Sequence, residues 1–138
     1  MTLRHKSREF ALQMLFEWDM ARQEPARIEQ FFWKSARAAD ETRRFANQLF
    51  EGAIAQAEAI DQLVEQLSEN WRLSRLATVD RNILRLAIYE FRAGTAPPKV
   101  VIDEALELAK KFSSAEAPAF LNGVLDAARK HLEAQTSA

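Results

Sequence analysis

The stretch that decides the fold of this chain is DRNILRLAIYEF, at residues 80–91. Its apolar side chains, from Ile83 to Phe91, cover most of the circumference of a helix. A helix that is apolar nearly all round packs against neighbours on several sides. Gly94 then offers a C-cap, and the residues TAPP at 95–98 form the firmest loop of the chain. We therefore expect a central helix at about 79–92, with the other elements arranged around it.

Apolar residues at helical spacing predict further helices on both sides of this centre. The expected segments are 3–22, 25–39, 40–67, 99–112 and a last helix that starts near 115–118, with a short helical turn at 73–76. The pattern over 40–67 fits one long or kinked helix, or two in series, with Gly52 as a weak point. Asp40 is expected to cap this segment, residues 68–71 to end it, and the tail at 134–138 to fray. Alternating apolar and polar runs are missing, so the sequence predicts an all-α fold of about seven helices.

The composition sets limits on the class of protein. A length of 138 residues, with 48% hydrophobic residues, predicts a single domain over 1–138, and 3 Gly with 4 Pro leave few turns. The chain has no cysteine, which excludes disulfides and thiolate metal sites and fits the cytoplasm. No apolar run is long enough to span a membrane. The net charge of −1 means that any nucleic-acid binding must depend on a local patch or on a helper protein.

The sequence lacks the arrangements that usually carry catalysis. His5 and His131 lie at opposite ends of the chain, and the three glycines are isolated, so neither a metal motif nor a phosphate loop is present. The carboxylates at 103, 104 and 107 are best explained as the solvated first turn of a helix, which its dipole favours. We therefore expect a protein that is not an enzyme and that uses no cofactor or metal.

Three fixed positive charges, on Arg4, Lys6 and Arg8, lie within five residues at the N-terminus. On a helix Arg4 and Arg8 share one face, whereas Lys6 points about 160° away. The cluster could wrap a phosphate backbone, particularly if residues 1–5 form a flexible arm. A solubilising N-terminus is the alternative, and the charge pattern alone favours it.

Other features leave two interpretations open. By its spacing Phe112 belongs to the core, although an aromatic side chain beside Lys110 and Lys111 could also stack on an unpaired base. The charged residues of the central helix could form buried ion pairs or a surface for a partner; they are Asp80, Arg81, Arg85 and Glu90. Gly123 lies inside a helical pattern, which indicates a close approach between helices because glycine is otherwise unfavourable there.

The order of these segments resembles the NusB family of transcription antitermination factors. The resemblance is strongest over residues 73–129 and returns in REFALQMLF at residues 8–16. It implies two small helical bundles packed together. It also implies binding to the boxA element of ribosomal RNA leader transcripts, with the ribosomal small-subunit protein NusE as partner, in an RNA polymerase antitermination complex.

The resemblance also implies which residues make these contacts. By position, the RNA-binding residues are Arg4, Lys6, Arg8, Phe16, Phe112, Glu116, Phe120 and Asn122. The partner surface falls on the middle helices, at Asp80, Arg81 and Glu90. Phe16 replaces a tyrosine of some members and therefore lacks a hydroxyl. Two alternatives remain: a helical interaction module or homodimer that does not bind RNA, and a fragment of an RNA methyltransferase, because NusB-like domains also occur fused to such enzymes.

Overall fold

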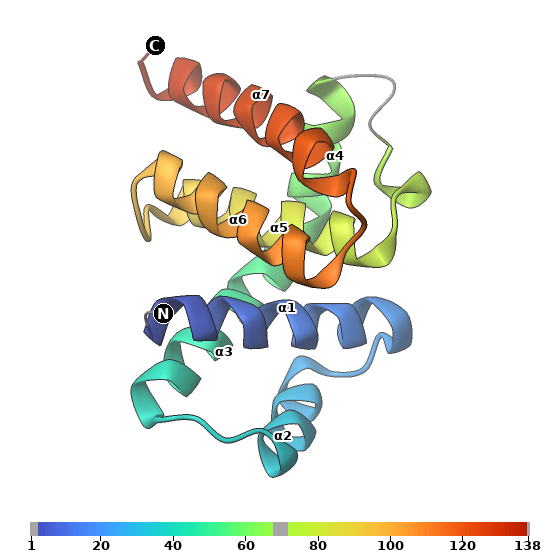
Figure 1. Ribbon diagram of the computed structural model, residues 1–138, viewed down its shortest axis with the longest axis vertical. Coiled ribbons are helices and arrows are strands. Elements are labelled where there is room, and N and C mark those ends of the chain that lie inside the picture. The colour runs from blue at the N-terminus through green and yellow to red at the C-terminus, as the bar shows by residue number, and fades with distance from the viewer. Residues whose placement is uncertain (1–2, 68–71, 138) are drawn as a thin grey trace.

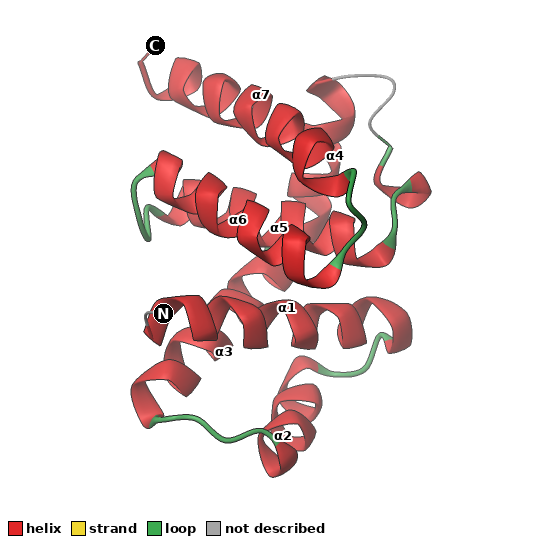
Figure 2. Cartoon of the chain, in the orientation of Figure 1, coloured by secondary structure: helices red, strands yellow, loops and turns green. Residues whose placement is uncertain are grey.

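The computed structural model describes residues 3–67 and 72–137, and these residues are almost entirely helical (Figure 2). The elements are α1 (Leu3–Ala21), α2 (Pro25–Ser35), α3 (Asp40–Ala55), α4 (Ala57–Leu67), the 3-10 turn η1 (Leu73–Arg75), α5 (Thr78–Ala93), α6 (Pro98–Phe112) and α7 (Ala117–Ser137). The described residues contain no strand. The all-α fold with seven α-helices predicted from the sequence is therefore confirmed.

The helices form two bundles that pack against each other through α5 (Figure 1). Helices α1, α2 and α3 form one bundle, and α4, α6 and α7 surround α5 in the other. Helix α5 packs against α1, α3, α4, α6 and α7, and every residue from Asn82 to Glu90 is buried. One hydrophobic core runs through both bundles, from Leu12 in α1 to Leu125 in α7. The nearly all-apolar circumference of α5 is explained by this central position.

The segment 40–67 is two helices in series, and the break lies at Gln56 rather than at Gly52. Gly52 is inside α3, and a Cβ atom placed on it would collide with the ring of Tyr89 in α5. The expectation that Gly52 is a weak point was therefore wrong, because this glycine allows two helices to approach closely. Asp40 is the first helical residue and not the cap, a position that Ala39 takes without a side-chain hydrogen bond.

Four further expectations need correction, and one is confirmed. Gly94 caps α5 with a φ of +68°, as predicted. Gly123 faces open space, so it permits no close helix contact. Helix α7 continues to Ser137 where fraying was expected, and α2 ends at Ser35. Helix α1 already begins at Leu3, so the expected flexible arm is helical from there. The expected end of a segment at 68–71 lies outside the described residues.

Buried ion pairs fasten α1 to α5 at two levels. Near the start of α1, Arg8 binds Glu90 at 2.8 Å. Near its end, Asp19 binds Arg81 and Arg85 at 2.5 and 3.0 Å. The two helices therefore run antiparallel. Of the two interpretations left open for the charges of α5, buried ion pairs account for Arg85 and Glu90, whereas Arg81 pairs with Asp19 from a partly buried position.

Candidate nucleic-acid interface

A polar seam joins α1 to α6. The imidazole of His5 lies between two carboxylates, with Nδ1 at 2.6 Å from Glu104 and Nε2 at 3.0 Å from Glu9. At the C-terminal end of α6, the ammonium of Lys111 donates to both carboxylate oxygens of Glu9, at 3.0 and 3.1 Å. Burial alone raises the pKa of Glu9, but Lys111 and His5 outweigh it and lower the pKa overall. The seam therefore holds the C-terminal end of α6 beside α1 as a charged contact.

Two predicted RNA residues of α1 lie along this seam. Phe16 follows Glu9 by seven residues, so it is on the same face of the helix. Its side chain is 39% exposed. Lys6 is also exposed, with Nζ at 3.7 Å from Glu9. The structure thus brings a cation and an exposed aromatic ring to the face of α1 that meets α6.

Arg4 lies in the first turn of α1 and remains exposed. Its guanidinium donates to the carbonyl of Thr95 at 2.8 Å and lies 4.5 Å from the ring centroid of Phe45. These two contacts hold the Arg4 side chain in one orientation, whereas a flexible arm would leave it mobile. Arg4 can still present unused N–H groups to an anion, because a guanidinium carries five donors.

The other predicted RNA residues lie where α6 meets α7: Phe112 ends α6, Glu116 is in the connecting loop, and Phe120 and Asn122 are in the first turns of α7. Phe112 is half-buried and packs on the core, while Lys111 Nζ lies 5.4 Å from its ring centroid. Glu116 and Asn122 are exposed, and so is Phe120 at the start of α7. The ends of α6 and α7 therefore offer aromatic rings, and the loop and α7 offer polar groups, a combination that suits single-stranded RNA recognition.

Arg8 and Glu90, by contrast, lie in the interior, where their side chains are only 3% and 2% exposed. Arg8 donates from Nε and Nη2 to the two oxygens of Glu90, and the hydroxyl of Thr95 donates to the same carboxylate at 2.6 Å. Burial alone lowers the pKa of Arg8, but Glu90 more than compensates and raises it. Neither side chain can contact RNA or a protein without breaking this pair. The predictions that Arg8 binds RNA and that Glu90 binds the partner are therefore not supported by their positions in the fold.

Asp80 and Arg81, at the start of α5, are only partly buried. Asp80 accepts a hydrogen bond from the hydroxyl of Ser113 at 2.5 Å, which ties α5 to the end of α6. Arg81 donates to Asp19. Both side chains therefore have structural partners and also reach the surface, Asp80 beside the α6–α7 loop and Arg81 beside the end of α1.

Two further exposed residues of α1, Gln13 and Met20, lie beside the predicted contacts. Gln13 follows Lys6 by seven residues, and Met20 follows Phe16 by four and is 65% exposed. Both therefore extend the exposed strip of the helix. Helical spacing from the predicted residues would have identified them.

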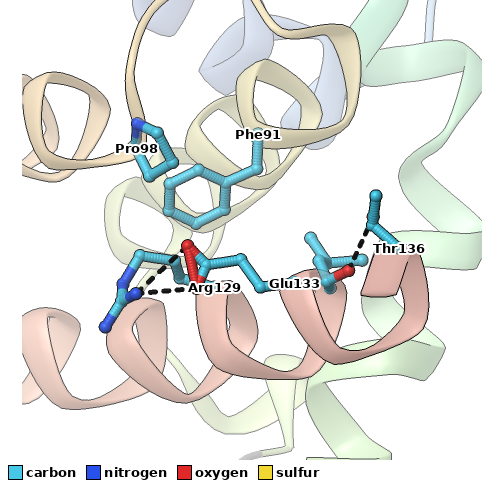
Figure 3. A pocket seen from close by; sticks show the side chains of 6 residues that line it. Phe91, Pro98, Arg129, Glu133 and Thr136 are labelled. Atoms are coloured by element: carbon cyan, nitrogen blue, oxygen red, sulfur yellow. Dashed lines mark hydrogen bonds and ion pairs between the residues drawn. The ribbon is translucent and has the colours of Figure 1, made fainter. Parts of the chain in front are cut away.

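A pocket of about 440 Å³ lies away from this surface, against the second half of α7 (Figure 3). Phe91 and Pro98 face Arg129, whose guanidinium binds Glu133 at 2.9 Å. The hydroxyl of Thr136 donates to a main-chain carbonyl. The lining thus presents an ion pair over apolar side chains.

Within residues 3–67 and 72–137 no cluster of metal-binding side chains occurs, and no helix could cross a membrane.

These observations define a class: a small all-helical protein of two bundles, with exposed basic and aromatic side chains on α1 and at the ends of α6 and α7 that meet beside it. The chain belongs to the NusB family, whose sequence pattern matches residues 5–130. It is 48% identical over 134 residues to the transcription antitermination protein NusB of Koribacter versatilis, covering 96% of this chain and 92% of that protein.

Solved structures of the family show the same arrangement of helices. T. maritima NusB matches with a TM-score of 0.82 and 32% identity, covering 92% of this chain and 90% of that one. A crystal structure of the antitermination factors NusB and NusE in complex with double-stranded RNA matches with a TM-score of 0.86 and 28% identity. That match covers 95% of this chain and 98% of its counterpart. The implied two-bundle NusB-like fold is therefore confirmed.

Proposed function

We propose that this chain is a transcription antitermination factor that binds RNA together with NusE. The observation that carries the proposal is its match, over 95% of its length, to a structure solved with NusE and RNA. The proposed setting is an RNA polymerase antitermination complex in the cytoplasm, and the proposed role is binding without catalysis. The RNA is of the boxA type, in leader transcripts of ribosomal RNA.

The RNA surface that we propose follows α1 and the α6–α7 loop. Its residues are Arg4, Lys6, Phe16, Phe112, Glu116, Phe120 and Asn122. The cations would hold phosphates and the aromatic rings would stack on unpaired bases. The carboxylate of Glu116 and the amide of Asn122 would bond to base edges. Arg8 contributes indirectly, because its pair with Glu90 holds α1 in place.

NusE supplies the part of the affinity that this chain lacks. A net charge of −1 gives little general attraction for a polyanion. We place the partner surface at the start of α5, around Asp80 and Arg81. Asp80 adjoins the α6–α7 loop through its hydrogen bond from Ser113, and Arg81 is the next residue of α5. One complex could therefore join RNA and protein contacts.

The test is fluorescence anisotropy of a labelled boxA-type RNA and a scrambled control, titrated with this protein alone and with NusE. The same RNA annealed to its complement distinguishes single-stranded from double-stranded binding. Tighter binding to the boxA-type RNA, increased further by NusE, is the expected result. Equal binding to both sequences in every condition would contradict the proposal.

The contribution of α1 is tested by Arg4→Ala with Lys6→Ala. Losing two phosphate contacts to a single strand should lower the slope of log affinity against log salt by about 1.4. Arg92→Ala with Lys130→Ala is the matched control, because it removes the same charge from exposed positions of α5 and α7. An equal change in the control would show that general charge, and not the α1 contacts, is responsible.

The exposed apolar side chains of α1 favour a second candidate, a homodimer without direct RNA binding. Phe16 and Met20 lie on one strip of the helix and would be covered by a second copy. Sedimentation at several protein concentrations, with and without RNA, separates the two functions. A dimer that persists unchanged when RNA is added would favour the interaction module.

A further inference from the structure

The outer face of α2 combines an exposed aromatic ring with two cations. Arg27, Phe31 and Lys34 follow one another at i, i+4 and i+7, so they share one face of the helix. Phe31 is 53% exposed, although Ile28 of the same helix is buried in the core. The guanidinium of Arg27 lies 5.8 Å from the ring centroid of Phe31, and Lys34 Nζ lies 4.9 Å from it. The ring is therefore flanked by positive charge and open to solvent.

The cations of this face are not neutralised by carboxylates. In the part of the chain that the structure describes, neither Arg27 nor Lys34 forms an ion pair, whereas Lys111 and Arg81 both do. Arg37, just beyond the helix, is also exposed. The charge of this face is thus available to an external anion.

The single acidic residue of α2, Glu29, holds its proton more tightly than an ordinary carboxyl does. Burial comes first among the causes, followed by a hydrogen bond and repulsion from Glu51 of α3, and together they raise the pKa of Glu29 to about 8. Arg43 of α3 acts in the opposite direction but does not cancel these effects. One carboxyl oxygen of Glu29 is buried without a hydrogen-bond partner. Helix α2 is therefore positive as a whole.

An aromatic cluster connects α2 to the proposed RNA surface on α1. The ring of Phe10 in α1 lies 5.6 Å from that of Phe32 and 5.3 Å from that of Trp33, both in α2. Lys6, one of the proposed phosphate contacts, lies with Nζ at 5.8 Å from the Phe10 ring. An RNA strand that reaches Lys6 is therefore near the start of a second basic and aromatic surface.

We propose that the face formed by Arg27, Phe31 and Lys34 is a second contact for single-stranded RNA, which holds nucleotides that flank the boxA-type segment. This inference rests on the proposed RNA-binding function. A base stacks on Phe31, and the cations, about 10 Å apart along the helix axis, bind the phosphates on either side. Stacking tolerates any base, so the contact responds to the length of the RNA and not to its sequence.

The test compares two labelled RNAs, the boxA-type segment alone and the same segment extended by flanking nucleotides, each bound to the full chain with NusE. Phe31→Ala should weaken binding of the extended RNA by about fivefold or more and leave the short RNA unaffected. Arg27→Gln with Lys34→Gln should lower the salt slope for the extended RNA by about 1.4.

Val100→Ala is the matched control, because Val100 is an exposed apolar residue of α6. Thermal melting of each variant confirms that it is folded. If Phe31→Ala binds both RNAs as the unchanged protein does, the α2 contact is refuted and the proposed function stands. If Phe31→Ala weakens only the capture of NusE, α2 is a protein surface and the RNA contact is again refuted. Failure of the unchanged protein to bind either RNA overturns both proposals.

Discussion

Replacing Arg8 by alanine separates a structural role from an RNA contact. In the folded protein Arg8 donates two hydrogen bonds to Glu90, at 2.9 and 2.8 Å, from a position that is only 3% exposed. After Arg8→Ala, the buried carboxylate of Glu90 keeps the hydroxyl of Thr95 as a partner and loses its counter-charge. The variant should therefore be much less stable, although the deleted residue belongs to a basic cluster.

The magnitude follows from the cost of leaving one charge buried and unpaired. Removing one partner of a buried ion pair destabilises a protein by about 3–5 kcal/mol. Two hydrogen bonds to a charged group, each contributing roughly 1.5–3 kcal/mol, give a similar sum. The total stability of a domain is about 5–15 kcal/mol, so Arg8→Ala should remove a large part of it. Arg8→Met combined with Glu90→Leu removes both charges and should restore most of the loss.

The assay is urea unfolding followed by far-ultraviolet circular dichroism, applied to Arg8→Ala, to the double variant and to Lys6→Ala. The exposed Lys6 should change the free energy of unfolding by no more than about 0.5 kcal/mol. If Arg8→Ala is equally mild, and weakens RNA binding as much as Lys6→Ala does, the buried-pair reasoning is refuted and Arg8 is an RNA contact.

Three further predictions concern stability. Gly52→Ala should destabilise the protein by about 1–3 kcal/mol, because the added Cβ atom would collide with Tyr89. Gly123→Ala should stabilise α7 by up to about 1 kcal/mol, because this position faces open space. Thermal melting of the two variants tests both expectations. Folding raises the pKa of Glu29 from 4.5 to about 8, so between these pH values the folded state binds more protons than the unfolded state. The free energy of unfolding therefore falls as the pH rises through this range. Glu29→Gln should abolish this fall, which is measured as the difference between the melting temperatures at about pH 5 and about pH 9. Burial alone raises the pKa of Asp19, but its arginine and asparagine partners outweigh burial and lower the pKa below 3.8. The folded protein therefore loses stability as the pH falls below about 4, because Asp19 must then take up a proton. Asp19→Asn should reduce this loss in acid titrations.

The central helix shows how far the sequence leads. The apolar circumference of α5 predicted its place among several neighbours, and Gly94 predicted its end, because both depend on local geometry. The glycines show the limit of this reasoning. The sequence gives no reason to distinguish Gly52, which touches Tyr89, from Gly123, which touches nothing, because the difference lies in which helix packs opposite each one.

The candidate site shows the same division. Phe16 and Phe120 are exposed, which the proposed RNA contacts require, and the end of α6 lies beside α1 through the Lys111–Glu9 pair. Arg8 is the exception, because a charge pattern at the N-terminus does not reveal a carboxylate 82 residues later in the chain. Phe112, left open between core and stacking, is half-buried.

The sequence by itself determined the helices, their approximate ends, the central place of α5 and the resemblance to the NusB family, because helical periodicity and capping are properties of neighbouring residues. The tertiary structure alone decided which charged side chains form ion pairs inside the protein and which remain exposed at its surface. An ion pair such as Arg8–Glu90 forms only when packing brings distant residues together and removes them from water. The same packing leaves Arg27 and Lys34 facing the solvent without an ion pair among the described residues, where a polyanion could reach them.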